Sequence, residues 1–418
     1  MDQRIRAKYL VETALPLEKA AASLAGEQST GTFIALARET EAFLDQHAAH
    51  VERITELDHV PGPALPGASS PPGALWRRAE LEISWPLHNI GPSLPNLMSM
   101  VAGNMFELRQ FSGIRLLDIH LPDAFAERYP GPQFGIQGTR DAAGVQSGPI
   151  LGTIIKPSIG MSAEETGALV AELCEAGIDF IKDDELQSDG PSCPFEDRVT
   201  HVMRAIDAHA QKTGKRVMFA FNVTGEIDEM KRRHDAVVKA GGTCVMVSLN
   251  SCGLTGFSAF RAHCELPIHG HRNGWGALTR HPSLGFDYVA WQKLWRLAGA
   301  DQMHVNGLKN KFYESDASVL ASAKACLTPM FEAPLPACTV MPVFSSGQTA
   351  LHARATFDAM KTTDLIFTCG GGIMGHPGGP AAGIASIRQA WDAAIAGEDL
   401  SSAAARHPEL AKAVEIFG

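Results

Sequence analysis

Eight short apolar segments, alternating with helical patterns, occupy the chain from about residue 148 to its end and constrain the fold more than any other feature. Short apolar strands separated by amphipathic helices indicate consecutive βα units. Eight units in about 270 residues suit a (β/α)8 barrel, which usually needs roughly 250 residues. A doubly wound open sheet is the alternative, but the first βα turn, KPSIGMSAEE, has no G-x-G-x-x-G. The predicted strands are 150–157, 179–184, 216–224, 243–250, 266–273, 302–308, 339–346 and 364–371.

The N-terminal part of the chain follows a different pattern. Residues 5–12 and 79–85 alternate with the period of a strand, and GIRLLDIHLP from Gly113 predicts another strand. PLEKAAASLAGEQ from Pro16 predicts a helix. These elements predict an α+β domain with an antiparallel sheet. The expected division is an N-terminal α+β domain at 1–125, a linker at 126–147 and a barrel domain at 148–418.

Composition narrows the possible partners. The 418 residues are 45% hydrophobic and 20% charged, so the chain can bury a core. Its net charge of -10 argues against nucleic acid, because a phosphate backbone requires a basic surface. No apolar run is long enough to span a membrane, and MDQRIRAKYL lacks a secretory core, so we expect a cytoplasmic protein that binds a small molecule. The eight cysteines form no C-x-x-C pair and are predicted to be mostly buried reduced thiols.

Polar and ionisable residues collect at the ends of the predicted strands. A barrel carries its chemistry at the carboxyl ends of its strands. Each such residue alone could be an ordinary loop residue, but their coincidence on one rim predicts a functional site. They are Lys156, Lys182, Asp183, Asp184, Glu185, Asn222, Thr224, Asn250, His269, His271, Arg272, Asn273, His304, Asn306, Ser345, Ser346, Gly370, Gly371 and Gly372.

The run IKDDE suggests a metal site. Strand residues i and i+2 share a face, so Lys182 and Asp184 should both point inward, and Glu185 can turn in at the strand end. One interpretation is an ion pair in a polar barrel core. The other is a Mg²⁺ site, because Mg²⁺ prefers oxygen ligands. A protonated lysine cannot bind Mg²⁺, but a lysine carbamate can, which would give three anionic donors.

Three further features bear on binding of an anionic substrate. The triplet Gly370 to Gly372, before HPGGPAAG, can present backbone N–H groups to phosphate, although such triplets also occur in ordinary turns. Arg272 and His304 offer a cation and a hydrogen-bonding group. GLKNKFYE after the sixth strand could be a mobile loop that carries Lys311 over the site, or a plain solvated loop.

Seven motifs resemble the large subunit of ribulose-bisphosphate carboxylase/oxygenase (RuBisCO), and more closely its form IV RuBisCO-like relatives. They are GTIIKPSIG, GIDFIKDDE, HGHR, HVNGLKNK, CGGGIMGHPGGPAAG, GEQSTGTF and AGNMF. The resemblance covers nearly the whole chain. It implies a TIM barrel preceded by a ferredoxin-like α+β domain.

The resemblance also implies roles for individual residues. Lys182 would be carbamylated by CO2 and bind Mg²⁺ together with Asp184 and Glu185. Lys156 and His271 would be general acids or bases, and Lys311 the loop lysine. The residues implied to bind substrate are Arg272, His304 and Ser345 at one anionic end, Gly347, Gly370 and Gly371 at a phosphate, and Glu27, Thr32, Phe33 and Asn104 in the active site of a partner subunit. A homodimer would therefore be the minimal unit, with higher oligomers possible.

Three departures from the carboxylase pattern argue against CO2 fixation. Ser158 stands where the family has the second lysine of KPKLG, Ser346 stands within the family's Ser-Gly-Gly, and Phe33 replaces a tryptophan. Losing the second ammonium removes one organiser of the site, and a serine in the phosphate loop narrows the approach of phosphate to the backbone.

The retained residues suit another reaction. Mg²⁺ stabilises an enediolate, and a lysine ammonium can protonate the carbanion left when a C–C bond breaks. GEQSTGTF, HGHRNGWGALTR and GGGIMGHPGGPAAG resemble the RuBisCO-like branch of apiose catabolism, whose members act on 3-oxo-isoapionate 4-phosphate. Carboxyl transfer followed by hydrolysis to 3-phosphoglycerate and glycolate is favoured over simple decarboxylation, because Lys156, His271 and Lys311 all remain. The alternatives are an enolase or isomerase of methionine salvage and a non-catalytic phosphate-ligand sensor.

Overall fold

The computed structural model describes residues 3–31 and 36–418, which form two compact units. The first unit comprises Met1–Pro130, Gly274–Leu297 and Met330–Ala337, and the second comprises Gly131–Asn273, Ala298–Pro329 and Cys338–Gly418. Two segments after residue 148 therefore group with the N-terminal unit. The physical reason lies in Gly274–Leu297, which adds a strand to the N-terminal sheet.

The second unit is a closed barrel of eight parallel strands in the order β11-β12-β13-β5-β6-β7-β8-β9. Each of the eight predicted segments contains one of these strands, so the predicted (β/α)8 barrel is confirmed. The strands are shorter than the apolar segments, because the polar residues at their ends belong to loops. They are β5 (Ile150–Ile154), β6 (Phe180–Lys182), β7 (Met218–Asn222), β8 (Cys244–Ser248), β9 (Ile268–His271), β11 (Gln302–His304), β12 (Met341–Phe344) and β13 (Ile366–Thr368).

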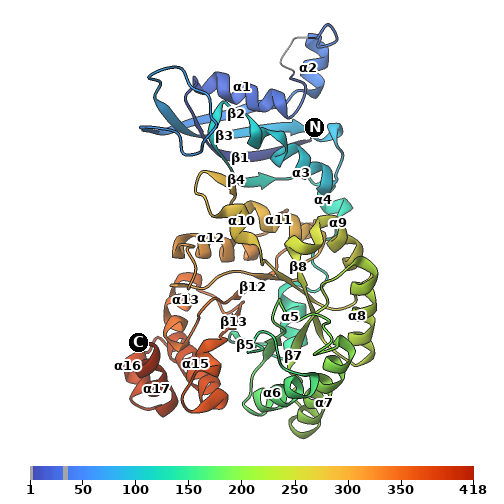
Figure 1. Ribbon diagram of the computed structural model, residues 1–418, viewed down its shortest axis with the longest axis vertical. Helices are drawn as coiled ribbons and strands as arrows, with labels where there is room; N and C mark the ends of the chain where they lie inside the picture. The colour runs from blue at the N-terminus through green and yellow to red at the C-terminus, as the bar shows by residue number, and fades with distance from the viewer. Residues whose placement is uncertain (1–2, 32–35) are drawn as a thin grey trace. The chain divides into compact units, whose positions relative to one another are not determined.

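Helices surround the barrel, and Figure 1 shows α6, α7, α8, α13 and α15 outside the strands. Local sequence fixes where they begin. Ser162 and Glu165 form a capping box at the start of α6, which satisfies two backbone N–H groups of the first turn. The helices of this unit are α5 (Gly135–Ala143), α6 (Ala163–Glu175), α7 (Phe195–Thr213), α8 (Ile227–Lys239), α9 (Leu249–Arg261), α12 (Asp316–Leu327), η3 (Ala350–His352), α13 (Ala353–Met360), α14 (Gly371–Met374), α15 (Gly379–Ile395), α16 (Leu400–Ala404) and α17 (Pro408–Phe417).

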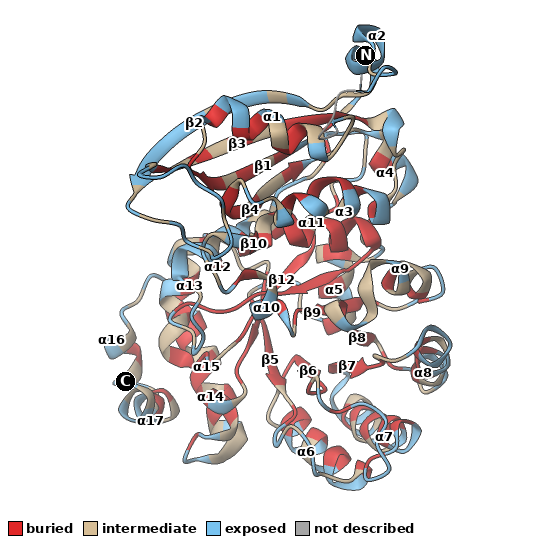
Figure 2. Cartoon of the chain, turned by 45° about the horizontal axis from the view of Figure 1, so that its top comes forward, coloured by how far each residue is buried: buried red, intermediate tan, exposed pale blue. Residues whose placement is uncertain are grey.

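The interior of the barrel is a packed apolar core. Figure 2 shows its strands as buried, whereas its helices carry exposed outer faces. Phe180 fills the space beside Gly152, where an added Cβ would lie only 2.8 Å from the Phe180 ring and 2.9 Å from the Thr368 methyl group. A larger residue at 152 would therefore collide with the core. The core comprises Ala143, Ile150, Phe180, Met218, Ala220, Cys244, Met246, Met341, Val343 and Ile366.

The first unit is built on a five-stranded sheet in the order β10-β4-β1-β3-β2. All its pairs are antiparallel except β10 with β4, so the predicted antiparallel sheet is confirmed. The strands are β1 (Arg4–Thr13), β2 (His50–Val60), β3 (Trp76–Pro86), β4 (Phe111–His120) and β10 (Leu284–Phe286). The helices are α1 (Leu17–Glu27), α2 (Glu41–His47), η1 (Leu87–Asn89), α3 (Leu94–Ala102), η2 (Asn104–Glu107), α4 (Ala124–Arg128), α10 (Trp275–Thr279) and α11 (Tyr288–Ala298).

Two other sequence-based expectations can be compared with the structure. All cysteines except Cys252 are buried, and burial raises the pKa of the Cys174 thiol to about 12. Among the described residues, none of the helices combines the length and hydrophobicity that a membrane span requires.

Candidate active site

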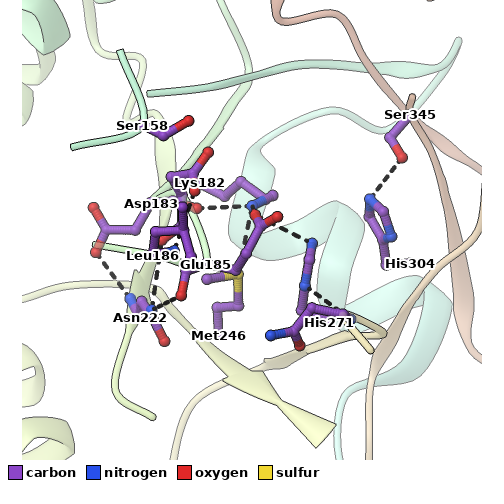
Figure 3. A network of polar contacts seen from close by, with 12 residues as sticks. Ser158, Lys182, Asp183, Glu185, Leu186, Asn222, Met246, His271, His304 and Ser345 are labelled. Atoms are coloured by element: carbon purple, nitrogen blue, oxygen red, sulfur yellow. Dashed lines mark hydrogen bonds and ion pairs between the residues drawn. The ribbon is translucent and has the colours of Figure 1, made fainter. Parts of the chain in front are cut away.

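Lys182 ends β6 with its side chain only 1% exposed, above the apolar core of the barrel. Its Nζ donates to the Asp183 carbonyl at 2.8 Å and lies 3.6 Å from the Met246 sulfur, which belongs to that core (Figure 3). The nearest carboxylate is that of Glu185, with Oε2 3.7 Å from Nζ. Burial lowers the pKa of Lys182, even though the carboxylates around it favour the charged form. A larger fraction of this amine is therefore neutral than on an exposed lysine.

Asp183 takes part in a separate buried network. Its Oδ2 accepts from Arg198 Nε at 3.2 Å and from the Asn222 backbone N–H at 2.9 Å, and both charged side chains are fully buried. Burial raises the pKa of Asp183 despite the guanidinium. Asp183 thus anchors α7 to the barrel strands, and Asp184 is the aspartate of this run that meets Lys156.

Lys156, two residues beyond β5, contacts Asp184 directly. Its Nζ donates to Asp184 Oδ2 at 2.7 Å and to Ser158 Oγ at 2.8 Å. Burial alone would raise the pKa of Asp184, but hydrogen bonds from Lys156 and the Leu186 backbone, with the lysine charge, outweigh it and lower that pKa. Asp184 is therefore a carboxylate at neutral pH, which a cation site requires.

Asn222 at the end of β7 holds the loop that follows β6. Its Nδ2 donates to the carbonyls of Glu185 at 3.3 Å and Gln187 at 3.1 Å, while its Oδ1 accepts from Thr224 Oγ1 at 2.6 Å. The sequence placed Asn222 at a strand end, but did not predict this positioning role. Its side chain fixes the backbone that carries both predicted carboxylate ligands.

Three histidines, His269, His271 and His304, lie near Lys182 on β9 and β11. His271 Nε2 is 3.6 Å from Glu185 Oε2, and its ring centroid is 4.5 Å from that of His304. His304 Nε2 lies 2.6 Å from Ser345 Oγ (Figure 3). Burial lowers the pKa values of His271 and His304, and it lowers that of His269, deeper in the barrel, to about 3. All three rings are therefore neutral at neutral pH, so the site presents imidazole rather than imidazolium.

Arg272 and Asn306 both donate to one buried carboxylate, that of Glu314. Arg272 Nη2 and Asn306 Nδ2 each lie 2.6 Å from Glu314 Oε2, and both members of the ion pair are 7% exposed. Glu314 was not among the residues predicted from the sequence. The available signal was an acidic residue in GLKNKFYE directly before Ser315, the N-cap of α12.

The remaining barrel residues predicted to bind substrate lie on the loops after β11, β12 and β13, with Gly371 at the start of α14. The Lys311 backbone N–H donates to the Ser346 carbonyl at 3.2 Å, which joins the loop after β11 to the loop after β12. A Cβ added to Gly347 would lie 3.7 Å from Lys311 Cβ, and one added to Gly370 would lie 3.8 Å from Lys156 Cε. A Cβ at Gly371 would meet nothing within 4 Å. Gly371 therefore borders open space.

Glu27 and Asn104 belong to the first unit, and both are exposed. Glu27 ends α1 and lines a cavity of about 830 Å³ together with Arg38, Phe43 and other residues of that unit. Thr32 and Phe33 lie outside the described residues. The structure of the single chain therefore leaves the predicted contribution to a partner's site as a prediction.

A second cluster of possible metal ligands consists of His234, Asp235 and His263. His234 Nε2 accepts from the Glu265 backbone N–H at 3.0 Å, so in the neutral ring Nδ1 carries the proton, which it donates to Asp235 Oδ1 at 3.0 Å. The lone pair that a metal would need at Nδ1 is thus absent. This cluster is a hydrogen-bonded network in which Asp235 also contacts His263 at 2.7 Å.

The donor set at the end of β6 fits Mg²⁺ better. Asp184 and Glu185 supply carboxylate oxygens, and Lys182 can supply another oxygen only as a carbamate. The lowered pKa of the buried Lys182 amine favours the neutral form that adds CO2. The carbamate would be an anion beside Glu185, and a bound cation would balance the two charges. The fold and these groups define a class of protein, a (β/α)8-barrel enzyme whose strand ends gather carboxylates, lysines and neutral histidines.

Comparison with known proteins then identifies the family. The chain belongs to the ribulose bisphosphate carboxylase large-chain family, because the model of the N-terminal domain matches residues 3–125 and that of the catalytic domain matches 135–417. A 3-oxo-isoapionate-4-phosphate transcarboxylase/hydrolase of Xanthobacter autotrophicus is 55% identical over 100% of both chains. A 3-oxo-isoapionate-4-phosphate decarboxylase of Rhizobium etli is 44% identical over 98% of this chain and 97% of that protein.

A solved structure agrees with this assignment. The crystal structure of a rubisco-like protein from Burkholderia fungorum superposes with a TM-score of 0.93 and 44% identity, and covers 99% of this chain and 100% of that one. The RuBisCO-like architecture that the motifs implied is therefore confirmed.

Proposed function

We propose that this protein is a Mg²⁺-dependent enzyme that converts 3-oxo-isoapionate 4-phosphate to 3-phosphoglycerate and glycolate by carboxyl transfer and hydrolysis. One observation carries the chemistry: the buried Lys182 amine lies beside Glu185, while Lys156 is hydrogen-bonded to Asp184. The choice of substrate is supported by the full-length relative of that activity, at 55% identity.

The carbamate of Lys182, with Asp184 and Glu185, would hold Mg²⁺. The ion would stabilise negative charge that develops on adjacent oxygens of the substrate. Asn222 fixes the backbone of this ligand segment through its bonds to the Glu185 and Gln187 carbonyls. Lys182 thus serves in catalysis by holding the ion, not by exchanging protons.

Lys156 is the proton donor of the proposal. Hydrolytic cleavage beside the transferred carboxyl group leaves a carbanion on the carbon that becomes C2 of 3-phosphoglycerate, and the Lys156 ammonium protonates it. Asp184, at 2.7 Å, orients that ammonium. His271, neutral because of its burial, can accept a proton from the water that adds to the ketone.

The two ends of the substrate differ in charge. We place its phosphate at Gly370 and Gly371, with Gly347 nearby, and the other end near His304, Ser345 and Arg272. Lys311, joined to the Ser346 carbonyl through its backbone, would cover the substrate from the loop after β11. Ser158 occupies the place of the carboxylases' second lysine, so the proposal excludes CO2 fixation as the activity.

Decarboxylation of the same substrate is the second candidate. It is favoured by the 44% identity to the decarboxylase over 98% of this chain. The reactions share the loss of a carboxyl group from a 3-oxo acid and differ in whether that group is recaptured before protonation.

Phosphorus NMR of the purified protein with 3-oxo-isoapionate 4-phosphate, Mg²⁺ and bicarbonate tests the proposal. We expect the signal of 3-phosphoglycerate, with glycolate detected in the proton spectrum, and no turnover in excess EDTA. A tetrulose phosphate instead would assign the decarboxylase activity. An unchanged substrate spectrum would overturn both. Lys182→Ala should be inactive, and Glu164→Gln, an exposed change on α6, should retain activity.

A further inference from the structure

Glu314 is a buried carboxylate with no assigned role, placed among residues proposed to bind one end of the substrate. Oε2 accepts from Arg272 Nη2 and from Asn306 Nδ2, both at 2.6 Å, and Oε1 accepts from Ser318 Oγ at 2.8 Å. Three donors thus satisfy a side chain that is 7% exposed. Charge-assisted bonds of this length are among the strong hydrogen bonds of proteins.

The backbone around Glu314 holds it in place. Glu314 directly precedes Ser315, the N-cap of α12, whose side chain accepts from the Ser318 backbone. Asn310 Nδ2 donates to the Glu314 carbonyl at 3.0 Å and to that of Gly307 at 3.1 Å, which closes the loop on itself. The carboxylate is therefore fixed from the helix side and from the loop side, unlike a side chain at a free loop tip.

The charge of Glu314 changes what the neighbouring groups can bind. The single positive charge of Arg272 is balanced by one carboxylate at 2.6 Å. A phosphate dianion placed against Arg272 would also lie against the buried Glu314 carboxylate, and like charges in a buried site repel strongly. A hydroxyl group or a single carboxylate meets far less repulsion.

We propose that Glu314 is a specificity-determining residue that restricts the active site to substrates with one phosphate. It occupies the anionic subsite formed by Arg272 and Asn306, so that only the Gly370–Gly371 end remains for phosphate. The assignment of the two ends rests on the proposed function, whereas the pairing of Arg272 Nη2 with Glu314 Oε2 rests on the contacts alone.

Two unreactive probes test this selectivity: pentane-1,5-diol bisphosphate and its monophosphate, titrated calorimetrically into the full-length protein with Mg²⁺. The wild-type protein should bind them within about threefold of each other. Glu314→Gln, which keeps the shape and removes the charge, should bind the bisphosphate about tenfold to a hundredfold more tightly and the monophosphate within about threefold of wild type. Equal tightening of both probes, or tightening of neither, would overturn the proposal.

Three further variants complete the design. Glu314→Asp keeps the charge and should keep the wild-type preference, and Glu164→Gln removes a distant exposed charge and should change neither affinity. The double variant Arg272→Met with Glu314→Gln removes both buried charges, which is tolerated better than removing one. It should bind the bisphosphate within about threefold of wild type, because Arg272 adds little to the wild-type affinity while Glu314 balances its charge. A tenfold loss of affinity would show that Arg272 binds the second phosphate and would refute the proposal.

The probes separate this inference from the proposed function. They contain no carbonyl or carboxyl group, so their binding does not depend on turnover. If the NMR assay shows no reaction of the 3-oxo acid but Glu314→Gln gains the bisphosphate, the proposed function fails and the role of Glu314 stands. If the 3-oxo acid is turned over but Glu314→Gln binds the bisphosphate no more tightly than wild type, the proposed function stands and the role of Glu314 fails.

Discussion

Lys182 and Lys156 lie beside the predicted carboxylate ligands Glu185 and Asp184, and the environments of the two lysines differ. Lys182 is buried and has a pKa lowered by burial, whereas the side chain of Lys156 is 40% exposed and its ammonium is held on Asp184. The Lys182 amine is thus suited to react with CO2, whereas Lys156 is positioned by Asp184 to donate a proton.

Separate substitutions of the two lysines should have different effects. Mn²⁺ is a paramagnetic substitute for Mg²⁺. Lys182→Met should abolish activity and weaken Mn²⁺ binding by at least about tenfold, because a ligand is lost. Lys156→Met should retain Mn²⁺ affinity and lower kcat by about 10²- to 10⁴-fold, the usual cost of losing a general acid. Electron paramagnetic resonance titration with Mn²⁺ measures the first effect and NMR rates the second. Equal Mn²⁺ affinity in both variants would contradict the assigned roles.

His269 makes stability depend on pH. Its pKa is about 3 in the folded barrel because of burial, against about 6.5 in the unfolded chain. The folded state therefore binds fewer protons than the unfolded state. The contribution of this group to the free energy of unfolding is fully present above about pH 6.5 and is lost as pH falls towards 3. Over that window one such group contributes a slope of up to about 1.4 kcal/mol per pH unit.

His269→Gln should make unfolding less dependent on pH, because glutamine does not titrate. Urea unfolding of both proteins at pH 7, 6 and 5 measures the change. The wild type should lose more stability than the variant between pH 7 and 5, whatever their difference at pH 7. Parallel losses would show that His269 is not the group responsible. His271 and His304, also neutral in the folded state, remain in both proteins.

At the scale of elements, the loop after β6 depends on a neighbouring strand. Asn222 of β7 donates to the carbonyls of Glu185 and Gln187. Asn222→Ala removes the donor to these carbonyls. Each buried polar group left without a hydrogen-bond partner lowers the free energy of unfolding by about 1–3 kcal/mol. We expect lower thermal stability and Mn²⁺ affinity reduced by about tenfold, as for other groups that orient metal ligands.

The control for this prediction is Asn310→Ala, which removes two loop hydrogen bonds on the opposite side of the barrel mouth. It should lower stability to a comparable extent and leave Mn²⁺ affinity within about twofold of wild type. If both variants lost the same metal affinity, the effect of Asn222 would be one of general stability, not of ligand positioning.

The elements also show what could be predicted from the sequence. Barrel strands were predicted correctly because buried parallel strands are continuous apolar runs. The edge strand β2, with the sequence HVERITELDHV, was not predicted, because both its faces carry polar or exposed residues and it has no apolar alternation. The short β10 was missed because its partner, β4, is more than 150 residues away in the chain.

The candidate site divides in the same way. Its strand-end residues could be located because a barrel brings the carboxyl ends of its strands to one rim. The position of Glu314 and the contacts of Asn222 could not be predicted. Both depend on the path of loops, which local sequence patterns do not specify. The catalytic and ligand roles given by the family resemblance stay predictions until the variants above are measured.

At the scale of the whole molecule, we propose a homodimer whose active sites each combine one barrel with Asn104 and Glu27 of the partner chain. These two residues are exposed in the first unit. Two-fold assemblies are the most common oligomers, and they allow the same two surfaces to form both sites.

Heterodimers of two inactive variants test whether active sites are shared. Lys182→Met impairs the barrel part and Asn104→Ala the partner part, so each homodimer should lose at least about a hundredfold in activity. In a heterodimer, isolated with two different affinity tags after co-expression, the Asn104→Ala barrel meets the intact Asn104 of the other chain. One of the two sites is then complete, and about half of the wild-type activity should return. The heterodimer of Lys182→Met with Lys156→Met damages both barrels and should stay inactive. If the first heterodimer were as inactive as its parents, each active site would be built from a single chain.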